Sequence, residues 1–454
     1  MDPRKAGQQG PVPGQPGRQS SIDPHKQRWM LVGILFIAAL LRLWNLSAPK
    51  MGADESDHYF REMQQIHLLE FEQQRIHPVD LYHATSPGPS GHPLFAIQVT
   101  NLVMRVLPAT ATTARGVQAI AGVAMVGVVF LLGKDLFGEW EAVIAAGLAA
   151  VLPLAVRYNR TLYLDSIYSL LTTLVAWTTF RAFHTDRPLW TVLAGVCLGL
   201  AGATKTSAPV LVPFVLGYAL YVCWQERQAQ QEARRKAAEA ARQASRKRKG
   251  SRKKKRTTGT KAGGDRLDTR QPIPAAIKLV LILILALIVF WVDVDPSAYW
   301  TAIRHPVDTG YQHSVLAYFE HLWSARTWVL GVLIFLWTPF VPLAALASLV
   351  MLFIQWRQVS NREVLLVLWL LCLGPLALLH LVGISGEHGY LPFVAPVCLL
   401  AASSVARLRG TRLVVALALI FLPMLVASVL YGWRLVPTPY GSYLNLIDFG
   451  REYY

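Results

Sequence analysis

Two neighbouring carboxylates, Asp54 and Glu55, stand in the sequence directly after the first long apolar stretch. Carboxylates are costly close to a hydrocarbon boundary, so their placement there indicates a use in chemistry or binding. A carboxylate just outside a membrane can remove a proton from a hydroxyl group. Asp54 is therefore the candidate general base, and Glu55 either raises the pKa of its neighbour by like-charge repulsion or serves as a structural acceptor. Helix capping and plain solvation are the simpler roles open to Asp54.

Further oxygen and nitrogen ligands follow this pair, namely Asp57 and His58. Asp54, Asp57 and His58 are a candidate set for a divalent metal, although their spacing is not a recognised metal signature. The sequence indicates no certain cofactor. A divalent metal is the one candidate.

Several cations lie between apolar stretches further along the chain. Arg157 and Arg160 are three residues apart and share one face if helical, and Asp165 follows within the next helix. Lys205 lies between two apolar spans with almost no loop, so it must reach the interface or find an anion. Arg and Lys side chains are the usual ligands of phosphate. The simpler alternatives are an internal Arg160–Asp165 ion pair and an interface anchor at Lys205.

The composition identifies the elements that must position these residues. The chain has 454 residues, of which 53% are hydrophobic and 16% charged, and its mean hydropathy is +0.36. Apolar runs of about 17–20 residues are typical of membrane helices. We expect eleven spans, at 29–46, 114–133, 140–156, 162–180, 189–204, 206–224, 274–292, 327–354, 362–383, 390–405 and 411–431. The predicted fold class is therefore an all-α polytopic membrane protein.

The basic residues orient these spans. Residues 225–272 hold seventeen Lys and Arg against five Asp and Glu, a net charge of +12 out of +17 for the whole chain. Placing this segment and the N-terminus in the cytoplasm satisfies the positive-inside rule at every loop. The basic run could also bind nucleic acid, but it lacks interleaved aromatic residues, so we favour contact with anionic lipid and expect no nucleic acid partner.

These spans and loops divide the chain into five parts, and one further stretch predicts a helix that does not cross the membrane. We expect a disordered cytoplasmic N-terminus at 1–28, an N-terminal transmembrane catalytic module at 29–224 with the outer loop 47–113, a disordered basic cytoplasmic loop at 225–272, a C-terminal transmembrane module at 273–431, and an outer aromatic tail at 432–454. Residues 92–107 carry polar groups among apolar ones and predict an amphipathic helix lying on the outer interface.

Five short motifs, in order along the chain, resemble those of a known family. They are Asp54-Glu55, Gly91-His92-Pro93-Leu94, Asn159-Arg160 followed by Asp165, Ala203-Thr204-Lys205, and Glu387-His388-Gly389-Tyr390-Leu391-Pro392. This pattern is similar to that of the membrane glycosyltransferases of the GT-C fold, among them the protein O-mannosyltransferases and the lipid A aminoarabinose transferases. Three positions depart from it: Asn159 replaces a Ser, Thr206 replaces a Gly, and His388 stands where a permanent cation is common.

The resemblance implies a site and a reaction. A polyprenyl-phosphate-linked sugar would be the donor, and a hydroxyl group on a protein, lipid or glycan would be the acceptor, at the outer face of the plasma membrane. Asp54 would act as the base, assisted by Glu55. Arg160, Lys205, His388 and Arg157 would bind the donor phosphate, and His58, Tyr59, His92, Asp165 and Tyr390 would contact substrate. Membrane lipids would be further partners.

A transporter or flippase of a lipid-linked sugar is the alternative of a different class. Transporters usually show internal repeats and polar breaks at mid-membrane. Here the polar residues gather at one predicted face, which favours chemistry at an interface. A lipid-binding or scaffold protein without catalysis is a third reading.

Overall fold

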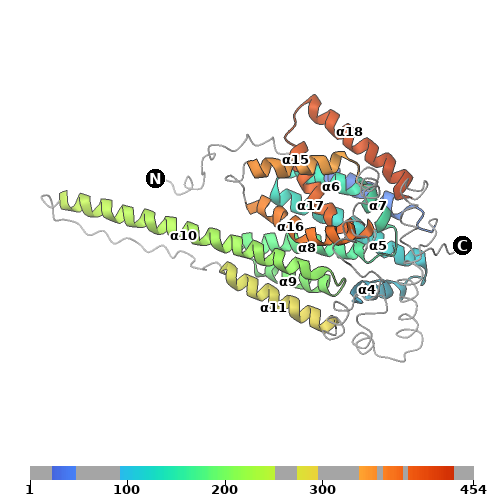
Figure 1. Cartoon of the computed structure of the whole chain (residues 1–454), viewed down its shortest axis with the longest axis horizontal. Coiled ribbons are helices and arrows are strands. Elements are labelled where there is room, and N and C mark those ends of the chain that lie inside the picture. Colours follow the sequence, from blue (N-terminus) through green and yellow to red (C-terminus); the bar gives the residue numbers. More distant parts are fainter. Residues whose placement is uncertain are drawn as a thin grey trace, which may run out of the picture.

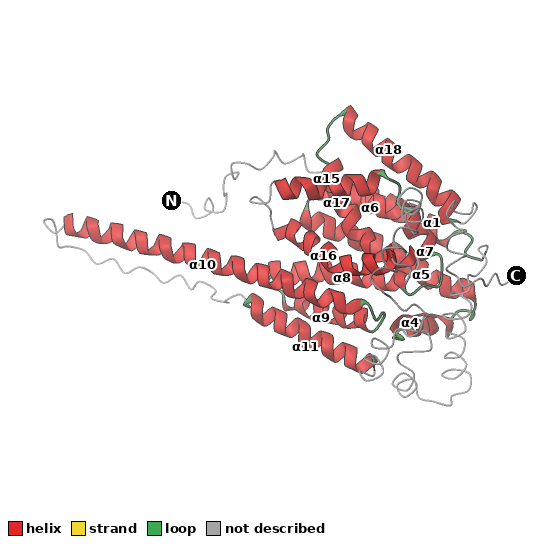
Figure 2. Ribbon diagram, in the orientation of Figure 1, coloured by secondary structure: helices red, strands yellow, loops and turns green. Residues whose placement is uncertain are grey.

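The computed structural model describes residues 23–47, 93–250, 273–294, 337–354, 361–381 and 387–433, and these residues form helices and connecting turns without a strand (Figures 1 and 2). The α-helices are α1 (Pro24–Leu43), α4 (Phe95–Met104), α5 (Ala111–Leu136), α6 (Glu139–Val151), α7 (Pro153–Asn159), α8 (Asp165–His184), α9 (Pro188–Gly202), α10 (Leu211–Gly250), α11 (Ala275–Asp293), α15 (Phe340–Ile354), α16 (Asn361–Leu381), α17 (Val394–Val405) and α18 (Thr411–Ala427). Shorter helical turns are η4 (Ala208–Val210), η7 (Glu387–Phe393) and η8 (Ser428–Gly432). The predicted all-helical class is confirmed for this part of the chain.

Consecutive long helices alternate in direction, so the bundle has two distinct ends. At one end the start of α8 meets the turn after α9, through the ion pair between Asp165 and Lys205. At the opposite end Lys278 of α11 donates to the carbonyl of Thr185 after α8, and Arg362 of α16 donates to the last carbonyl of α5. We call the first end the α7 end, because α7 lies there (Figure 1).

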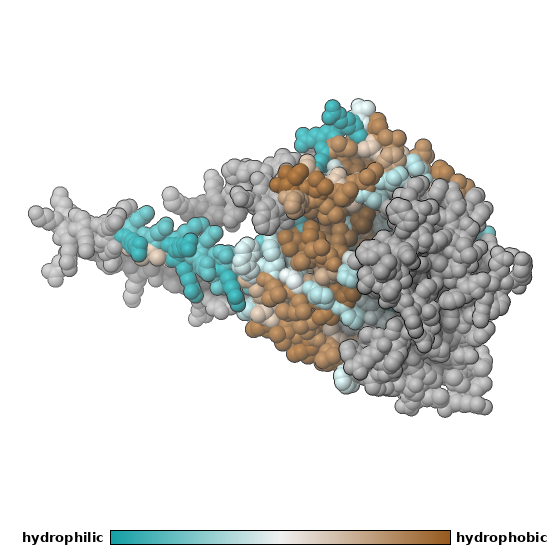
Figure 3. Space-filling model, viewed as in Figure 1, coloured by the Kyte–Doolittle hydropathy of each residue, from teal (hydrophilic) through white to brown (hydrophobic). Residues whose placement is uncertain are grey.

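The centre of the bundle and its exterior are both apolar. Residues Ala142–Val151 of α6 are all buried. Large hydrophobic side chains are exposed on the outer helices, as with Phe36 on α1, Trp291 on α11 and Leu422 on α18. Figure 3 shows this hydrophobic surface over the bundle. By length and apolarity alone, four of the described helices could cross a membrane, or five if the bent α6–α7 pair is one span. Apart from α4, each described α-helix overlaps an expected span, although α10 continues far past its expected end, and the count of eleven spans stays a prediction.

The pair α6–α7 is bent by 55° at its break. Pro153 begins α7 and has no N–H, so the carbonyls at the end of α6 need other donors. Arg42 of α1 donates to the carbonyls of Ala149 and Ala150 at 2.9 and 2.7 Å, and the Ser428 hydroxyl donates to that of Val151. Irregular backbone inside a membrane protein requires such internal partners.

Helices α9 and α11 approach closely where glycines lie on α9. A Cβ added to Gly199 would lie 2.6 Å from the Val289 Cβ and 2.7 Å from the Ala286 carbonyl oxygen. Small residues at helix contacts are typical of membrane bundles, where close packing replaces the hydrophobic driving force. This contact fixes the position of the turn that follows α9 and carries Lys205.

Helix α10 continues well beyond its apolar first half. Residues 226–243 are exposed, and they project from the bundle as a hydrophilic helix (Figures 1 and 3). The expected disordered loop at 225–272 is therefore helical as far as Gly250. Alanine has the highest helix propensity, and Glu232 stands four residues before Lys236 in the favourable order. These local preferences outweigh the repulsion among the basic residues.

Helix α4 falls within the stretch expected to lie on the interface. Its ten residues rise about 15 Å, half of a bilayer's hydrocarbon thickness. The backbone N–H of Phe95 donates to the Ala203 carbonyl at 3.1 Å, which ties α4 to the turn after α9. Interfacial placement of α4 stays a prediction.

Candidate active site

A buried ion pair joins two of the sequence-predicted site residues. The Lys205 ammonium donates to Asp165 Oδ1 at 2.5 Å, and the side chains are 10% and 1% exposed. The ammonium also lies 6.0 Å from the centre of the Tyr168 ring. A buried pair of this kind persists only when its geometry is good, because both charges have lost their water. The Asp165 carboxylate thus holds the Lys205 ammonium at a fixed position at the α7 end.

The local sequence explains how this pair forms. Asp165 begins α8, where a negative charge is favoured by the helix macrodipole. On the other side, Thr204 donates its hydroxyl to the Leu200 carbonyl, which closes the end of α9. The N–H of Lys205 donates to the Ala201 carbonyl, so the lysine follows the helix without a loop. Both partners therefore stand on rigid elements, as a precise site requires.

Arg160 lies at the C-terminal end of α1. Its Nη1 donates to the carbonyls of Leu41, Arg42 and Trp44 at 3.1, 3.2 and 2.7 Å, and its Nη2 donates to that of Asn45 at 3.2 Å. The last carbonyls of a helix have no intrahelical partner, and a cation there also complements the helix dipole. The structure thus gives Arg160 a capping role, while donor-phosphate binding by Arg160 stays a prediction.

Asn159 connects the neighbouring elements. It accepts from Arg42 Nε at 3.0 Å and donates to the Ser166 hydroxyl at 3.0 Å. Its side chain occupies the space beside Gly122, where a Cβ would lie 2.4 Å from the Asn159 Cγ. The Asn159-Arg160…Asp165 motif therefore joins α1, α5, α8 and the turn after α9.

Two buried arginines at this end are absent from the sequence-based site. Arg42 contacts the α6–α7 break described above and is 0% exposed. Arg115, near the start of α5, is 2% exposed and donates to the Leu46 carbonyl at 2.9 Å. The signal that could have found Arg42 is a charged residue inside an apolar span, which must have a buried partner. The sequence around Arg115 gives no comparable signal, because Arg115 lies at the edge of the expected span 114–133.

The remaining predicted residues within the described part lie on α7 and in η7. Arg157 is half-buried on α7, with its guanidinium 5.8 Å from the Tyr158 ring centre. Tyr390 lies in η7, with its ring 6.1 Å from that of Phe393. The Ser169 hydroxyl of α8 donates to the Leu391 carbonyl at 2.8 Å, so η7 packs against α8. The backbone of His388 belongs to the same turn.

The predicted base and its neighbours lie outside the described residues. These are Asp54, Glu55, Asp57, His58, Tyr59 and His92. Within the ranges that the structure describes, no group of three His, Cys, Asp or Glu side chains could hold a metal ion. The candidate metal set of Asp54, Asp57 and His58 therefore stays a prediction.

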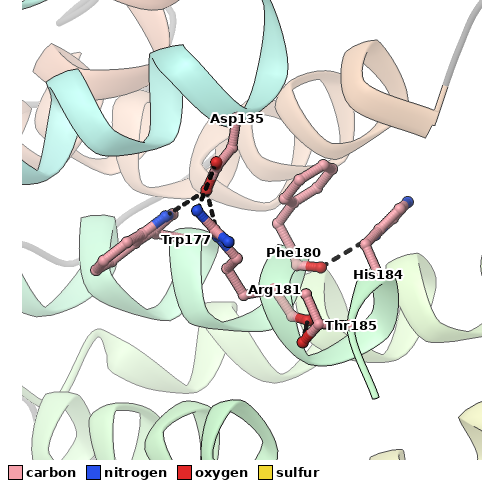
Figure 4. A network of polar contacts seen from close by, with 6 residues as sticks. All are labelled: Asp135, Trp177, Phe180, Arg181, His184 and Thr185. Carbon is pink, nitrogen blue, oxygen red and sulfur yellow. Dashed lines mark hydrogen bonds and ion pairs between the residues drawn. The ribbon is translucent and has the colours of Figure 1, made fainter. Parts of the chain in front are cut away.

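A second polar cluster occupies the opposite end of the bundle (Figure 4). Arg181 donates through Nε and Nη2 to the two oxygens of Asp135 at 2.5 and 2.7 Å, and Trp177 Nε1 donates to the same carboxylate at 2.8 Å. His184 stacks on Phe180 with ring centres 4.3 Å apart. Burial lowers the pKa of His184, and the nearby Arg362 and Lys278 lower it further against the raising effect of the Phe180 carbonyl. This cluster ties α5 to α8, and none of the sequence-predicted site residues belongs to it.

Comparison with known proteins identifies the fold. Residues 91–233 match the sequence model of the family described as Dolichyl-phosphate-mannose-protein mannosyltransferase. The apo form of the Archaeoglobus fulgidus oligosaccharyltransferase aligns with a TM-score of 0.55 and 14% identity, over 94% of this chain and 60% of that one. The A. fulgidus oligosaccharyltransferase AglB, in complex with an inhibitory peptide and a dolichol-phosphate, aligns with a TM-score of 0.52 and 15% identity, over 90% and 56% of the two chains.

The fold is that of the GT-C membrane glycosyltransferases, and the resemblance expected from the sequence is confirmed at this level. One curated protein, "Putative mannosyltransferase YkcB" of Bacillus subtilis (strain 168), is 33% identical over 105 residues. That match covers 23% of this chain and 15% of the curated relative, and the chain spans 56–60% of the two solved structures.

Proposed function

We propose that this chain is a membrane glycosyltransferase that moves a sugar from a polyprenyl-phosphate donor to a hydroxyl acceptor. The proposal rests on the residues that lie within 91–233, the segment that matches the family model. It contains Arg160, Asp165 and Lys205, and the structure brings all three to the α7 end of a GT-C fold. We further propose that this end faces outward at the plasma membrane, with the N-terminus in the cytoplasm.

The proposed reaction uses one base and a phosphate leaving group. Asp54 takes the proton of the acceptor hydroxyl, whose oxygen attacks the anomeric carbon with inversion. The bond between that carbon and the phosphate oxygen breaks, and its electron pair stays on the lipid phosphate. Glu55 assists Asp54 in this proposal, either through like-charge repulsion or as a structural acceptor. One base suffices, because the leaving group is already good and needs no second carboxyl group.

The leaving phosphate gains negative charge, which Lys205 is placed to stabilise. An ammonium has three donors, and Asp165 accepts from one of them. The pair therefore holds the ammonium at a fixed position for phosphate instead of leaving a mobile side chain. Arg157 and His388 are the proposed additional phosphate ligands, and the contribution of His388 depends on its protonation.

Substrate contacts complete the proposal. His58, Tyr59, His92 and Tyr390 are assigned to the sugar and the acceptor, with Asp165 acting through Lys205. A divalent metal bound by Asp54, Asp57 and His58 would hold the donor phosphate by charge. Removal of metal by a chelator, followed by a transfer assay with and without added Mg²⁺ or Mn²⁺, decides that point.

Transfer in vitro tests the function. The lipid that co-purifies with the protein is identified by mass spectrometry, and the corresponding radiolabelled lipid-linked sugar is supplied as donor. Asp54→Asn should abolish transfer while expression and lipid binding persist, because the amide cannot accept the proton. Glu70→Gln, a carboxylate in the same segment, is the matched control and should retain activity. Unchanged transfer by Asp54→Asn overturns the assigned base.

A transporter of lipid-linked sugar is distinguished by vesicle assays. Vesicles containing the protein and a fluorescent lipid-linked sugar are scored for movement of the label across the bilayer and for product formation. The glycosyltransferase proposal expects product without accelerated movement. Accelerated movement without product favours the transporter.

A further inference from the structure

Two lysines are buried in the described part of the chain, and they differ in what balances their charge. Lys205 forms the ion pair with Asp165 at the α7 end. Lys278, in the first turn of α11 at the opposite end of the bundle, is 6% exposed. Its ammonium donates to the Thr185 carbonyl at 3.0 Å, and no carboxylate of a described residue forms an ion pair with it. Within the described residues, Lys278 is thus a buried charge without a counter-charge.

The position of Lys278 favours an anion beside it for two separate reasons. A buried ammonium is costly unless it is paired, and the one carbonyl that accepts from Lys278 is neutral and engages one of its three donors. Lys278 also lies three residues after Ala275, the first residue of α11. The N-terminal end of a helix carries partial positive charge from the macrodipole, so it disfavours a second cation and attracts an anion.

The neighbours of Lys278 add positive charge. Its acceptor Thr185 directly follows His184 at the end of α8 (Figure 4). Arg362 of α16 and Lys278 both lie close enough to His184 for their charges to lower its pKa. The carboxylate in Figure 4, that of Asp135, is already engaged in its own ion pair. The charges of Lys278 and Arg362 are therefore not balanced within this cluster.

The surface next to Lys278 is apolar. Leu281 lies one turn further along α11 and is 41% exposed, and together with Ile284 and Ile288 it forms an exposed apolar strip that runs away from Lys278. Trp224, near the end of the apolar half of α10, is 56% exposed, and α10 packs against α11. Exposed Trp is typical of the headgroup level of a membrane. A ligand with a phosphate beside Lys278 and acyl chains along the strip fits these features.

We propose that Lys278 anchors the phosphate of an anionic phospholipid at this end of the bundle, with His184 and Arg362 adding positive potential around it. Basic sites between membrane helices are suited to such headgroups. In the topology proposed above, this lipid belongs to the inner leaflet. Its phosphate supplies the counter-charge that the described residues do not. The site lies at the opposite end from the Asp165–Lys205 pair, so the proposal does not depend on the transfer reaction.

The test measures binding to the full-length protein, purified in detergent and depleted of lipid. A short-chain phosphatidylglycerol, a phosphatidylcholine of the same chain length, and inorganic phosphate are titrated separately against the wild type, Lys278→Met and Lys134→Met. Native mass spectrometry counts the bound phospholipid, and the thermal midpoint is recorded in every titration. Lys134 is the matched control, because it is a cation at the same end of the bundle that is 45% exposed and lies 3.5 Å from Glu139.

We expect phosphatidylglycerol to bind the wild type saturably and to raise its thermal midpoint. Lys278→Met should lose about tenfold to hundredfold in affinity, the range of a hydrogen bond to a charged group, while Lys134→Met should bind as the wild type does. Without lipid, the midpoint of Lys278→Met should be no lower than that of the wild type, because the substitution removes a buried charge that lacks a counter-charge. A lysine that only caps α8 would give a lower midpoint with and without lipid, and that result overturns the proposal.

The other ligands separate the possible sources of the phosphate. Inorganic phosphate that binds as tightly as phosphatidylglycerol would overturn the assignment to a lipid, and phosphatidylcholine that binds as tightly would overturn the role of charge. Equal affinity of Lys278→Met and the wild type for phosphatidylglycerol overturns the site itself. If Lys278→Met does not fold, Lys278→Gln takes its place, because its amide can still donate to the Thr185 carbonyl without a charge, and it should show the same loss.

Discussion

At the scale of single residues, the Asp165–Lys205 pair bears both on folding and on the proposed binding of the donor phosphate. The carboxylate fixes the ammonium at the start of α8, and each charge makes the burial of the other tolerable. Removing one partner leaves a buried charge without its partner, which is far more damaging than removing both. The pair can therefore be separated experimentally into a folding contribution and a binding contribution.

Lys205→Met should lower the free energy of unfolding by about 3–5 kcal/mol, because the Asp165 carboxylate loses its ammonium. The double variant Asp165→Asn/Lys205→Met should recover most of that loss. Denaturation in detergent, followed by tryptophan fluorescence, measures the free energy of unfolding of these two variants and of the single variant Asp165→Asn. Strictly additive effects of the two substitutions would contradict the pairing. Donor binding should be weak in both variants, including the stabilised one.

His184, at the opposite end, predicts a dependence of stability on pH. Its pKa is lowered in the folded protein, chiefly by burial, so the unfolded chain takes up the proton first as the pH falls. Stability is therefore present above the ordinary histidine pKa of about 6.5 and decreases as the pH falls below it. The thermal midpoint should drop between about pH 7.5 and about pH 5.5, and His184→Phe should flatten this drop. His25→Phe, at an exposed position, should leave it in place.

At the scale of elements, the α9–α11 contact decides where the Lys205 turn lies. Gly199→Ala should destabilise the protein by about 1–3 kcal/mol, because the added methyl group meets the Ala286 carbonyl and the Val289 side chain. Gly33→Ala on α1 meets open space and should be neutral or stabilising by up to about 1 kcal/mol. Chemical denaturation of the two variants measures the contrast. Equal effects would show that the helices separate without cost.

The sequence predicted the elements well and their connections less well. Helices were expected at every described apolar span, because hydrophobic runs of that length leave few alternatives. The break at Pro153 and the helical extension of α10 were not anticipated, since the first depends on Arg42 as a remote donor and the second on local alanine content. The partner of Lys205 was foreseen only as an anion. That it is Asp165 depends on how α8 and α9 pack, which spacing does not encode.

At the scale of the whole molecule, the projecting part of α10 is separate from the site. Residues 226–243 are exposed, and the sequence-predicted site residues with described side chains lie at the α7 end, where α10 begins. Replacing residues 230–270 by a flexible linker of about 15 Gly and Ser residues should leave the thermal midpoint and the transfer rate unchanged. Both are measured against the full-length protein. A lower transfer rate at an unchanged midpoint would show that the extension takes part in the reaction.

The same straight extension has a practical use in imaging. A membrane protein of 50.4 kDa offers few features outside its detergent micelle for aligning particle images in electron cryomicroscopy. Helix α10 runs without interruption from the bundle to Gly250, so a soluble helical domain grafted in register onto it would move with the core. Such a graft would supply an external landmark for orienting each particle and would leave the α7 end uncovered.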